Sequence, residues 1–89
     1  MLCYIVAFHT ESAISKNKLR ERLRTYTAYC PIHDSCWAIK TDQSTANIRD
    51  YLTQVINKND FIFVIRSNTE AVWNSTYSEK NSAWLKENL

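Results

Sequence analysis

The residues best suited to chemistry lie at the end of the first apolar stretch, where the run CYIVAF is followed by His9, Thr10 and Glu11. An imidazole and a carboxylate two residues apart can act as general base and general acid, or can hold a transition metal. The neighbouring sequence offers no third ligand. The same residues also suit a loop that enters a helix, because a carboxylate is stabilised near the positive end of a helix. Both interpretations of His9 and Glu11 stay open at this stage.

A second group of potential ligands recurs at every third position, at Cys30, His33 and Cys36. Structural zinc takes four ligands as a rule, and the chain has no second cysteine pair that would complete such a site. We therefore predict no metal site here and interpret Cys30 and Cys36 as half-buried strand residues. With Cys3 the cysteines number three, which argues against a disulfide framework and fits a reducing compartment.

The composition excludes several function classes. The chain contains no glycine, which dinucleotide-binding and P-loop motifs need where the backbone approaches phosphate. Its 89 residues, 45% of them hydrophobic, suffice for one domain with one core. No run reaches the roughly 18 apolar residues of a membrane span, and the N-terminus lacks the pattern of a secretory signal. We expect a single cytoplasmic domain over residues 1–89, with no membrane segment.

The strongest charge signal lies between residues 16 and 24, where five basic residues stand against the single acid Glu21. The local charge is +4 in a chain whose net charge is +2. The basic residues are Lys16, Lys18, Arg20, Arg22 and Arg24. Such a concentration suits contact with the phosphates of DNA or RNA, and Tyr26 and Tyr29 just beyond it could stack on bases. A solvated helix face is the alternative interpretation.

The hydrophobic pattern predicts a strand near each end of the chain. Residues 2–8 form a continuous apolar run that is rich in β-branched and aromatic side chains, as is typical of a central strand. Residues 61–67, FIFVIRS, form a second run and are predicted to be a buried strand. Between the two, residues 27–41 read as a hairpin that bends at His33 and Asp34.

The remaining signals mark an edge strand and three helices. Pro31 demotes the first strand of the hairpin to an edge or bulged strand. In the second strand Trp37 and Ile39 share a face, which we expect to lie against the helices or a partner. Serine and threonine caps and apolar spacing predict helices from Ser12 or Ser15 to Tyr26, from Ser44 or Thr45 to Ile56, and from Ser78 in the tail.

This order of elements predicts a ferredoxin-like α+β sandwich, in which helices cover one face of an antiparallel sheet. The other face then needs a cover, and we place Tyr4, Trp37 and Phe63 on it. A second copy of the chain is the simplest cover, so we expect a homodimer with these three residues in the interface. For Trp37, burial in the core is the alternative.

The chain resembles the small bacterial proteins known as SinR-like, relatives of the CRISPR-associated Cas-two family. The stretches that carry the resemblance are CYIVAFHT, SCWAIKTDQSTANIRDYL, NDFIFVIRSNTEAVW and SAWLKENL. It implies a ferredoxin-like homodimer associated with nucleic acid. In the Cas-two family an aspartate ends the first strand, and the dimer holds a divalent metal between two such carboxylates for nucleic-acid cleavage. His9 takes that position here, so the resemblance implies a protein without efficient nuclease activity.

Two other functions remain open. A protein-binding module, such as an antitoxin, an immunity protein or an inhibitor, would use exposed aromatic residues, for which Trp73, Tyr77 and Trp84 are candidates. A metal-dependent nuclease or RNase toxin would instead depend on His9 and Glu11 with a divalent metal.

Overall fold

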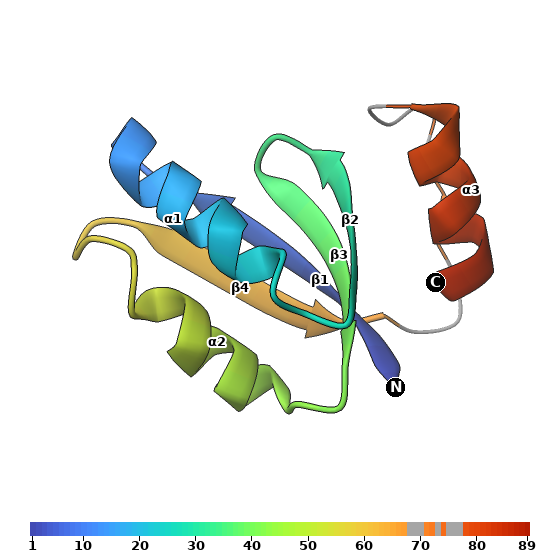
Figure 1. The fold of residues 1–89 in the computed structure, drawn as a ribbon, viewed down its shortest axis with the longest axis horizontal. Helices are drawn as coiled ribbons and strands as arrows, with labels where there is room; N and C mark the ends of the chain where they lie inside the picture. The colour runs from blue at the N-terminus through green and yellow to red at the C-terminus, as the bar shows by residue number, and fades with distance from the viewer. Residues whose placement is uncertain (68–70, 73, 75–77) are drawn as a thin grey trace.

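A computed structural model of the chain describes residues 1–67, 71, 72, 74 and 78–89. The elements among them are, in chain order, β1 (Leu2–His9), α1 (Ala13–Leu23), β2 (Ala28–His33), β3 (Cys36–Thr41), α2 (Thr45–Thr53), β4 (Phe61–Arg66) and α3 (Glu79–Asn88) (Figure 1). The order confirms the predicted succession of strand, helix, hairpin, helix, strand and terminal helix. Among the described residues, no helix has the length and apolar character needed to cross a membrane.

The four strands form one antiparallel sheet in the order β2-β3-β1-β4. β1 lies in the interior of the sheet, as its continuous apolar run predicts, and β2 and β4 are the edges. The pairing of β2 with β3 is irregular between Pro31 and His33, because a proline cannot donate to the ladder. This topology, with α1 and α2 on one face, confirms the ferredoxin-like α+β sandwich.

The main core lies between the sheet and the helices α1 and α2. Its buried residues are Tyr4, Val6 and Phe8 of β1, Trp37 and Ile39 of β3, Leu19 and Leu23 of α1, and Ile48 and Leu52 of α2. Successive strand side chains point to opposite faces, so Tyr4 shares its face with Val6 and Phe8. The prediction that Tyr4 and Trp37 lie on the face without helices is therefore wrong, and the alternative for Trp37, burial in the core, is confirmed.

On the opposite face of the sheet, the described residues that form a cover are those of α3, and they lie over one half of it. Leu85 of α3 packs there against Cys3, Cys30 and Ala38, with Trp84 beside them. The half formed by β4 exposes Phe61 by 68%, Phe63 by 62% and Ile65 by 51%. The prediction of a buried strand at residues 61–67 is thus wrong for one of its faces, because the strand order places β4 at an edge beyond the reach of α3. Of the three predicted interface residues, Phe63 alone lies on this uncovered half.

The helix starts follow the predicted caps, whereas two helix ends come early. Ser12, Ser44 and Ser78 each precede a helix, and each side chain accepts a hydrogen bond from the backbone N–H three residues on. The helix α1 ends at Leu23 and α2 at Thr53, three residues short of the prediction in each case. After Thr53 the chain turns more tightly, with hydrogen bonds between residues three apart, and Val55 and Ile56 still pack on the core.

Candidate functional site

The two predicted catalytic residues leave the sheet at the same end, but the structure does not bring their side chains into one site with a third group. His9 is exposed at the end of β1, and its ring centroid lies 6.3 Å from that of Phe61. The Glu11 side chain is also exposed, whereas its backbone N–H donates to Asp60 Oδ1 at 3.0 Å. The catalytic role of His9 and Glu11 stays a prediction.

Asp60 supplies a second carboxylate at this end of the molecule, and its oxygens accept hydrogen bonds from backbone N–H groups. Its Oδ2 accepts the N–H of Asn57 at 2.8 Å, and the Asn57 side chain donates to Ser15 Oγ at 2.8 Å. The buried Asp60 thereby ties the loop before α1 to the loop before β4. Within the described part of the chain, no group of three His, Cys, Asp or Glu residues could hold a metal ion. Sequence reasoning missed Asp60, because one of its partners, Glu11, lies far from it along the chain.

The cysteine and histidine repeat is divided between interior and surface. Cys30 is buried and Cys36 half-buried, while His33 is exposed. The Cys30 thiol donates to the carbonyl oxygen of Asn81 in α3 at 3.7 Å. Burial raises the pKa of the thiols of Cys3, Cys30 and Cys36, so each is held in its neutral form. Their environment suits packing better than nucleophilic chemistry.

The basic residues of α1 divide into two groups with different neighbours. Lys16 and Arg20 both form ion pairs with Asp34, which lies in the turn between β2 and β3. Arg22 turns toward α2, where it donates to the carbonyl oxygen of Tyr51 at 2.7 Å and to Gln54 Oε1 at 2.6 Å. Its guanidinium also lies 4.5 Å from the centroid of the Tyr51 ring. Arg22 therefore links the two helices and is not available as a free cation.

Three side chains converge on the indole of Trp37. The guanidinium carbons of Arg20 and Arg24 lie 5.8 and 5.4 Å from the ring centroid, within the range of cation–π attraction. The Tyr29 ring stacks on Trp37 with a centroid distance of 5.8 Å and an interplanar angle of 25°. Trp37 is fully buried under them, whereas Tyr29 is 40% exposed and Arg24 is exposed.

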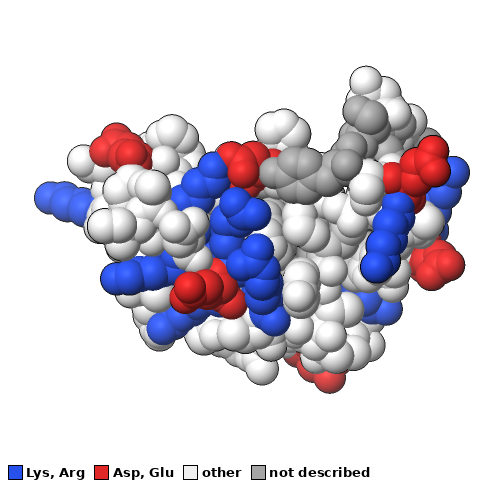
Figure 2. Space-filling model, turned by 45° about the horizontal axis from the view of Figure 1, so that its top comes forward, with Lys and Arg blue, Asp and Glu red and all other residues white. Residues whose placement is uncertain are grey.

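We call the group of Lys16, Arg20, Arg24, Tyr29 and Trp37, with Asp34 at its end, the Trp37 cluster. Lys16, Arg20 and Arg24 share one side of α1 because they follow one another at intervals of four residues. Figure 2 shows that Lys and Arg side chains gather on the part of the surface over α1, with acidic side chains among them. The cluster combines cations with a partly exposed aromatic ring. Sequence reasoning found its basic members and Tyr29, but missed the ion pairs of Asp34 and the contacts of Trp37 with Arg20 and Arg24.

Tyr26, the other predicted stacking residue, lies away from the Trp37 cluster. Its ring meets Tyr51 edge-on, with centroids 5.9 Å apart and an interplanar angle of 84°. The Tyr26 hydroxyl is buried and has no hydrogen-bond partner among the residues that the structure describes. Burial is the main cause that raises the pKa of Tyr26 to about 12. Of the two tyrosines, Tyr29 alone lies beside the basic side of α1.

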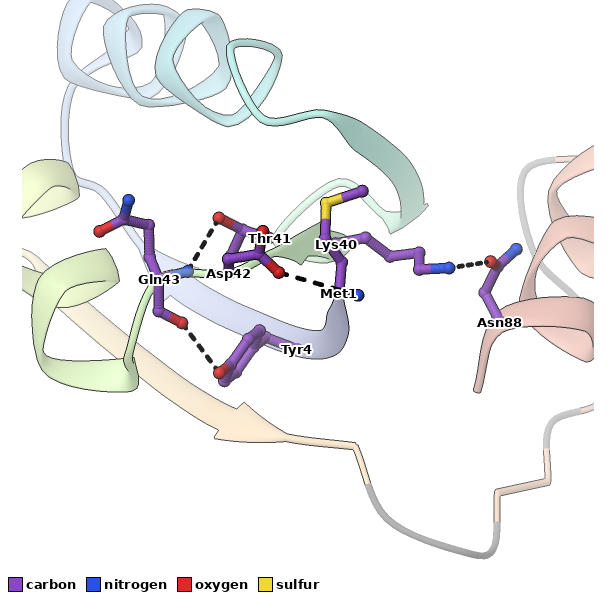
Figure 3. Close-up of polar contacts among 7 residues, drawn as sticks. All are labelled: Met1, Tyr4, Lys40, Thr41, Asp42, Gln43 and Asn88. Carbon is purple, nitrogen blue, oxygen red and sulfur yellow. Dashed lines mark hydrogen bonds and ion pairs between the residues drawn. The ribbon is translucent and has the colours of Figure 1, made fainter.

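A hollow of about 380 Å³ lies on the other side of Tyr26, between the α1–β2 connection and α2. Its lining consists of Thr25, Tyr26, Thr27, Thr41, Gln43, Asn47 and Tyr51. Polar contacts fix one wall: the Tyr4 hydroxyl donates to the Gln43 carbonyl oxygen at 2.9 Å, and the Gln43 N–H donates to Thr41 Oγ1 at 3.2 Å (Figure 3). The lining side chains are all neutral, so this hollow does not suit a charged ligand.

Neither a scan against protein-family models nor a search of curated proteins gives a match for this chain. Its function is therefore inferred from its own geometry. Among the predicted sites, the Trp37 cluster is where the described structure brings candidate residues from separate elements together: α1 supplies the cations, β2 supplies Tyr29 and β3 supplies Trp37.

Proposed function

We propose that the protein binds single-stranded nucleic acid through the Trp37 cluster and does not cleave it efficiently. The observation that carries this proposal is the convergence of an exposed arginine, Arg24, and a partly exposed aromatic ring, Tyr29, on the same buried indole. Single strands offer both phosphates for a cation and unstacked bases for a ring, so this pair of groups matches both parts of the ligand.

Each member of the cluster has a distinct part in the proposal. Tyr29 stacks on a base, and Arg24, whose guanidinium lies over the Trp37 ring, contacts a phosphate. Lys16 and Arg20 add positive charge, although Asp34 offsets part of it. Lys18 is exposed on another side of α1 and extends the positive field. Arg22 is assigned no part in binding, because its Nη1 group is bonded to α2 and its guanidinium lies over the Tyr51 ring.

The lack of efficient cleavage is supported at the end of β1. His9 stands where the resemblance places a metal-binding aspartate. Both oxygens of the nearby Asp60 carboxylate already accept backbone N–H groups, so this residue is poorly placed to replace that aspartate. A divalent cation would find oxygen ligands scarce here.

Fluorescence anisotropy with labelled single-stranded DNA and RNA, at two salt concentrations, tests the proposal. Tyr29→Ala removes one stacked base, which is worth roughly 1–3 kcal/mol, so Kd should rise about 5- to 150-fold. Arg24→Ala removes one phosphate contact and should lower the slope of log Kd against log salt by about 1. The matched control is Lys58→Ala, which removes an exposed cation from the loop before β4 and should leave both quantities unchanged.

Asp34→Asn supplies a test in the opposite direction. The substitution removes the negative charge beside Lys16 and Arg20, so binding should tighten. The proposal is refuted by an absence of binding at low salt. It is also refuted if Lys58→Ala weakens binding as much as Arg24→Ala, since that result would indicate a general charge effect.

A further inference from the structure

The hollow beside Tyr26 has the size and chemistry of a site for a small uncharged ring. Its volume of about 380 Å³ lies near the lower end of the range for small-molecule sites, so it admits a group of the size of a nucleobase. Among the described residues that line it, none carries a charge, which disfavours a phosphate or a metal ion as its ligand. The lining residues Thr27, Gln43 and Asn47 are exposed, so a ligand can enter from solvent.

Two side-chain amides of the lining offer a hydrogen-bond donor and an acceptor side by side. Asn47 Nδ2 donates to Gln43 Oε1 at 3.2 Å, which holds the two amides together. Among the described residues, Gln43 Nε2 and Asn47 Oδ1 have no hydrogen-bond partner. The edges of the nucleobases also carry a donor beside an acceptor, and Asn and Gln side chains pair with adenine in this way. The two amides are therefore complementary to the edge of a base.

The main chain holds both amide-bearing residues in place. The Gln43 N–H donates to Thr41 Oγ1 and its carbonyl oxygen accepts the Tyr4 hydroxyl, and these bonds leave the side-chain amide for other contacts (Figure 3). Asn47 lies in the first turn of α2, where its backbone N–H donates to Ser44 Oγ at 3.1 Å. A ligand that binds the two amides thus orders little of the backbone, which lowers the cost of binding.

Two aromatic rings complete the lining. Tyr26 and Tyr51 meet edge-on, with an interplanar angle of 84°, and both line the hollow. A flat heterocycle gains contact area and favourable ring contacts beside such a pair. The combination of two rings with a donor and an acceptor fits a planar base better than a flexible polar ligand.

This hollow adjoins the Trp37 cluster. Tyr29 of the cluster and Thr27 of the hollow are two positions apart in the chain, so their Cα atoms are at most about 7 Å apart. Thr41, which also lines the hollow, lies two residues after Ile39, the partner of Tyr29 in the ladder of β2 and β3. Consecutive nucleotides of an extended single strand span such a distance. A strand with one base on Tyr29 therefore brings the next base to the hollow.

We infer that the hollow receives the base next to the one that stacks on Tyr29, and that the amides of Gln43 and Asn47 read the edge of this base. The protein then prefers some bases to others at this position, whereas stacking on Tyr29 tolerates any base. The inference rests on the proposed nucleic-acid binding and adds to it a source of base preference in two named side chains.

Fluorescence anisotropy with short labelled homopolymers of deoxyadenylate, deoxycytidylate and thymidylate tests the inference. In the variant that carries both Gln43→Ala and Asn47→Ala, the tightest-binding homopolymer loses two neutral hydrogen bonds, so its Kd should rise about 5- to 150-fold. The Kd of the weakest-binding homopolymer should change little, so the three values converge. The slope of log Kd against log salt should stay the same, because the variant removes no phosphate contact.

Asn59→Ala is the matched control for the loss of an amide. Asn59 is exposed in the loop before β4, and its substitution should leave the three Kd values unchanged. Gln43 and Asn47 are exposed as well, so the double variant should fold, which urea unfolding checks.

Nuclear magnetic resonance identifies the group that enters the hollow. The side-chain NH₂ signals of Gln43 and Asn47 should shift when the tightest-binding homopolymer is added, and those of Asn59 should not. Glucose serves as an uncharged polar probe without a base and should leave all of these signals in place. A bound homopolymer that shifts neither Gln43 nor Asn47, or an equal shift with glucose, overturns the inference.

The failure of this inference is distinguishable from the failure of the proposed function. If no homopolymer binds at low salt, the proposed nucleic-acid binding is refuted and the inference is refuted with it. If the homopolymers bind and Tyr29→Ala weakens binding, but the double variant keeps the differences between the three Kd values, the inference alone is overturned.

Discussion

Asp60 should be one of the most sensitive polar positions in the protein. Its two carboxylate oxygens accept the N–H groups of Glu11 and Asn57, at 3.0 and 2.8 Å, from two loops that are far apart in the sequence. Asp60→Ala removes both acceptors and leaves two N–H donors without partners. A hydrogen bond to a charged group contributes about 1.5–3 kcal/mol, and water can reach part of this site, so we expect a loss of about 3 kcal/mol in the free energy of unfolding. Asp60→Asn keeps one acceptor oxygen and should cost about 2 kcal/mol.

Urea unfolding followed by tryptophan fluorescence, at one fixed protein concentration, measures these losses. With a slope of about 1 kcal/mol per M, Asp60→Ala should lower the midpoint by about 3 M. The control is Asp50→Ala, which removes a carboxylate that pairs with its neighbour Arg49 on the exposed side of α2 and should change stability by less than about 0.5 kcal/mol. A loss below about 1 kcal/mol for Asp60→Ala would show that the two loops are held by other contacts and would refute this account of the site.

Two further predictions concern aromatic residues. Burial raises the pKa of Tyr26 to about 12 from an ordinary value of 10, so the folded state holds the phenol proton more strongly than the unfolded state. The contribution of this proton to the free energy of unfolding is fully present below pH 10 and is lost as the pH rises toward 12. Tyr26→Phe should therefore reduce the fall in urea midpoint across this range, and an unchanged fall would contradict the prediction. Trp37→Ala removes the indole from a fully buried position and should cost about 3–5 kcal/mol in thermal or urea unfolding, whereas a loss under about 1 kcal/mol would show that the cluster does not depend on the ring.

Local patterns in the sequence were sufficient to predict the elements and their class of fold. The caps at Ser12, Ser44 and Ser78 act within three residues, and the apolar spacing of a strand or helix acts within one element, so both can be recognised without knowledge of the rest of the chain. Pro31 likewise marked an edge strand, because the loss of its N–H is a local property.

The contacts of the basic residues could not be predicted in the same way. The sequence showed five cations close together, but the acid that meets Lys16 and Arg20 is Asp34, which belongs to a turn beyond the next strand. Asp60 joins loops separated by 49 positions, counted from Glu11. Such pairs form only when the sheet has brought distant loops to one end of the molecule.

The sequence by itself determined the succession of strands and helices, the one-domain size and the concentration of positive charge on α1, since these depend on composition and short-range spacing. Tertiary structure alone decided which face each strand residue occupies. The alternation of side chains along a strand places Tyr4 and Trp37 on the opposite face of the sheet from the residues that α3 covers. The position of the helices α1 and α2 then determines which of the two faces packs into the main core. Phe63 is exposed because β4 lies at the edge of the sheet. The burial of a residue depends on the neighbours that the fold places around it and not on how apolar the residue is.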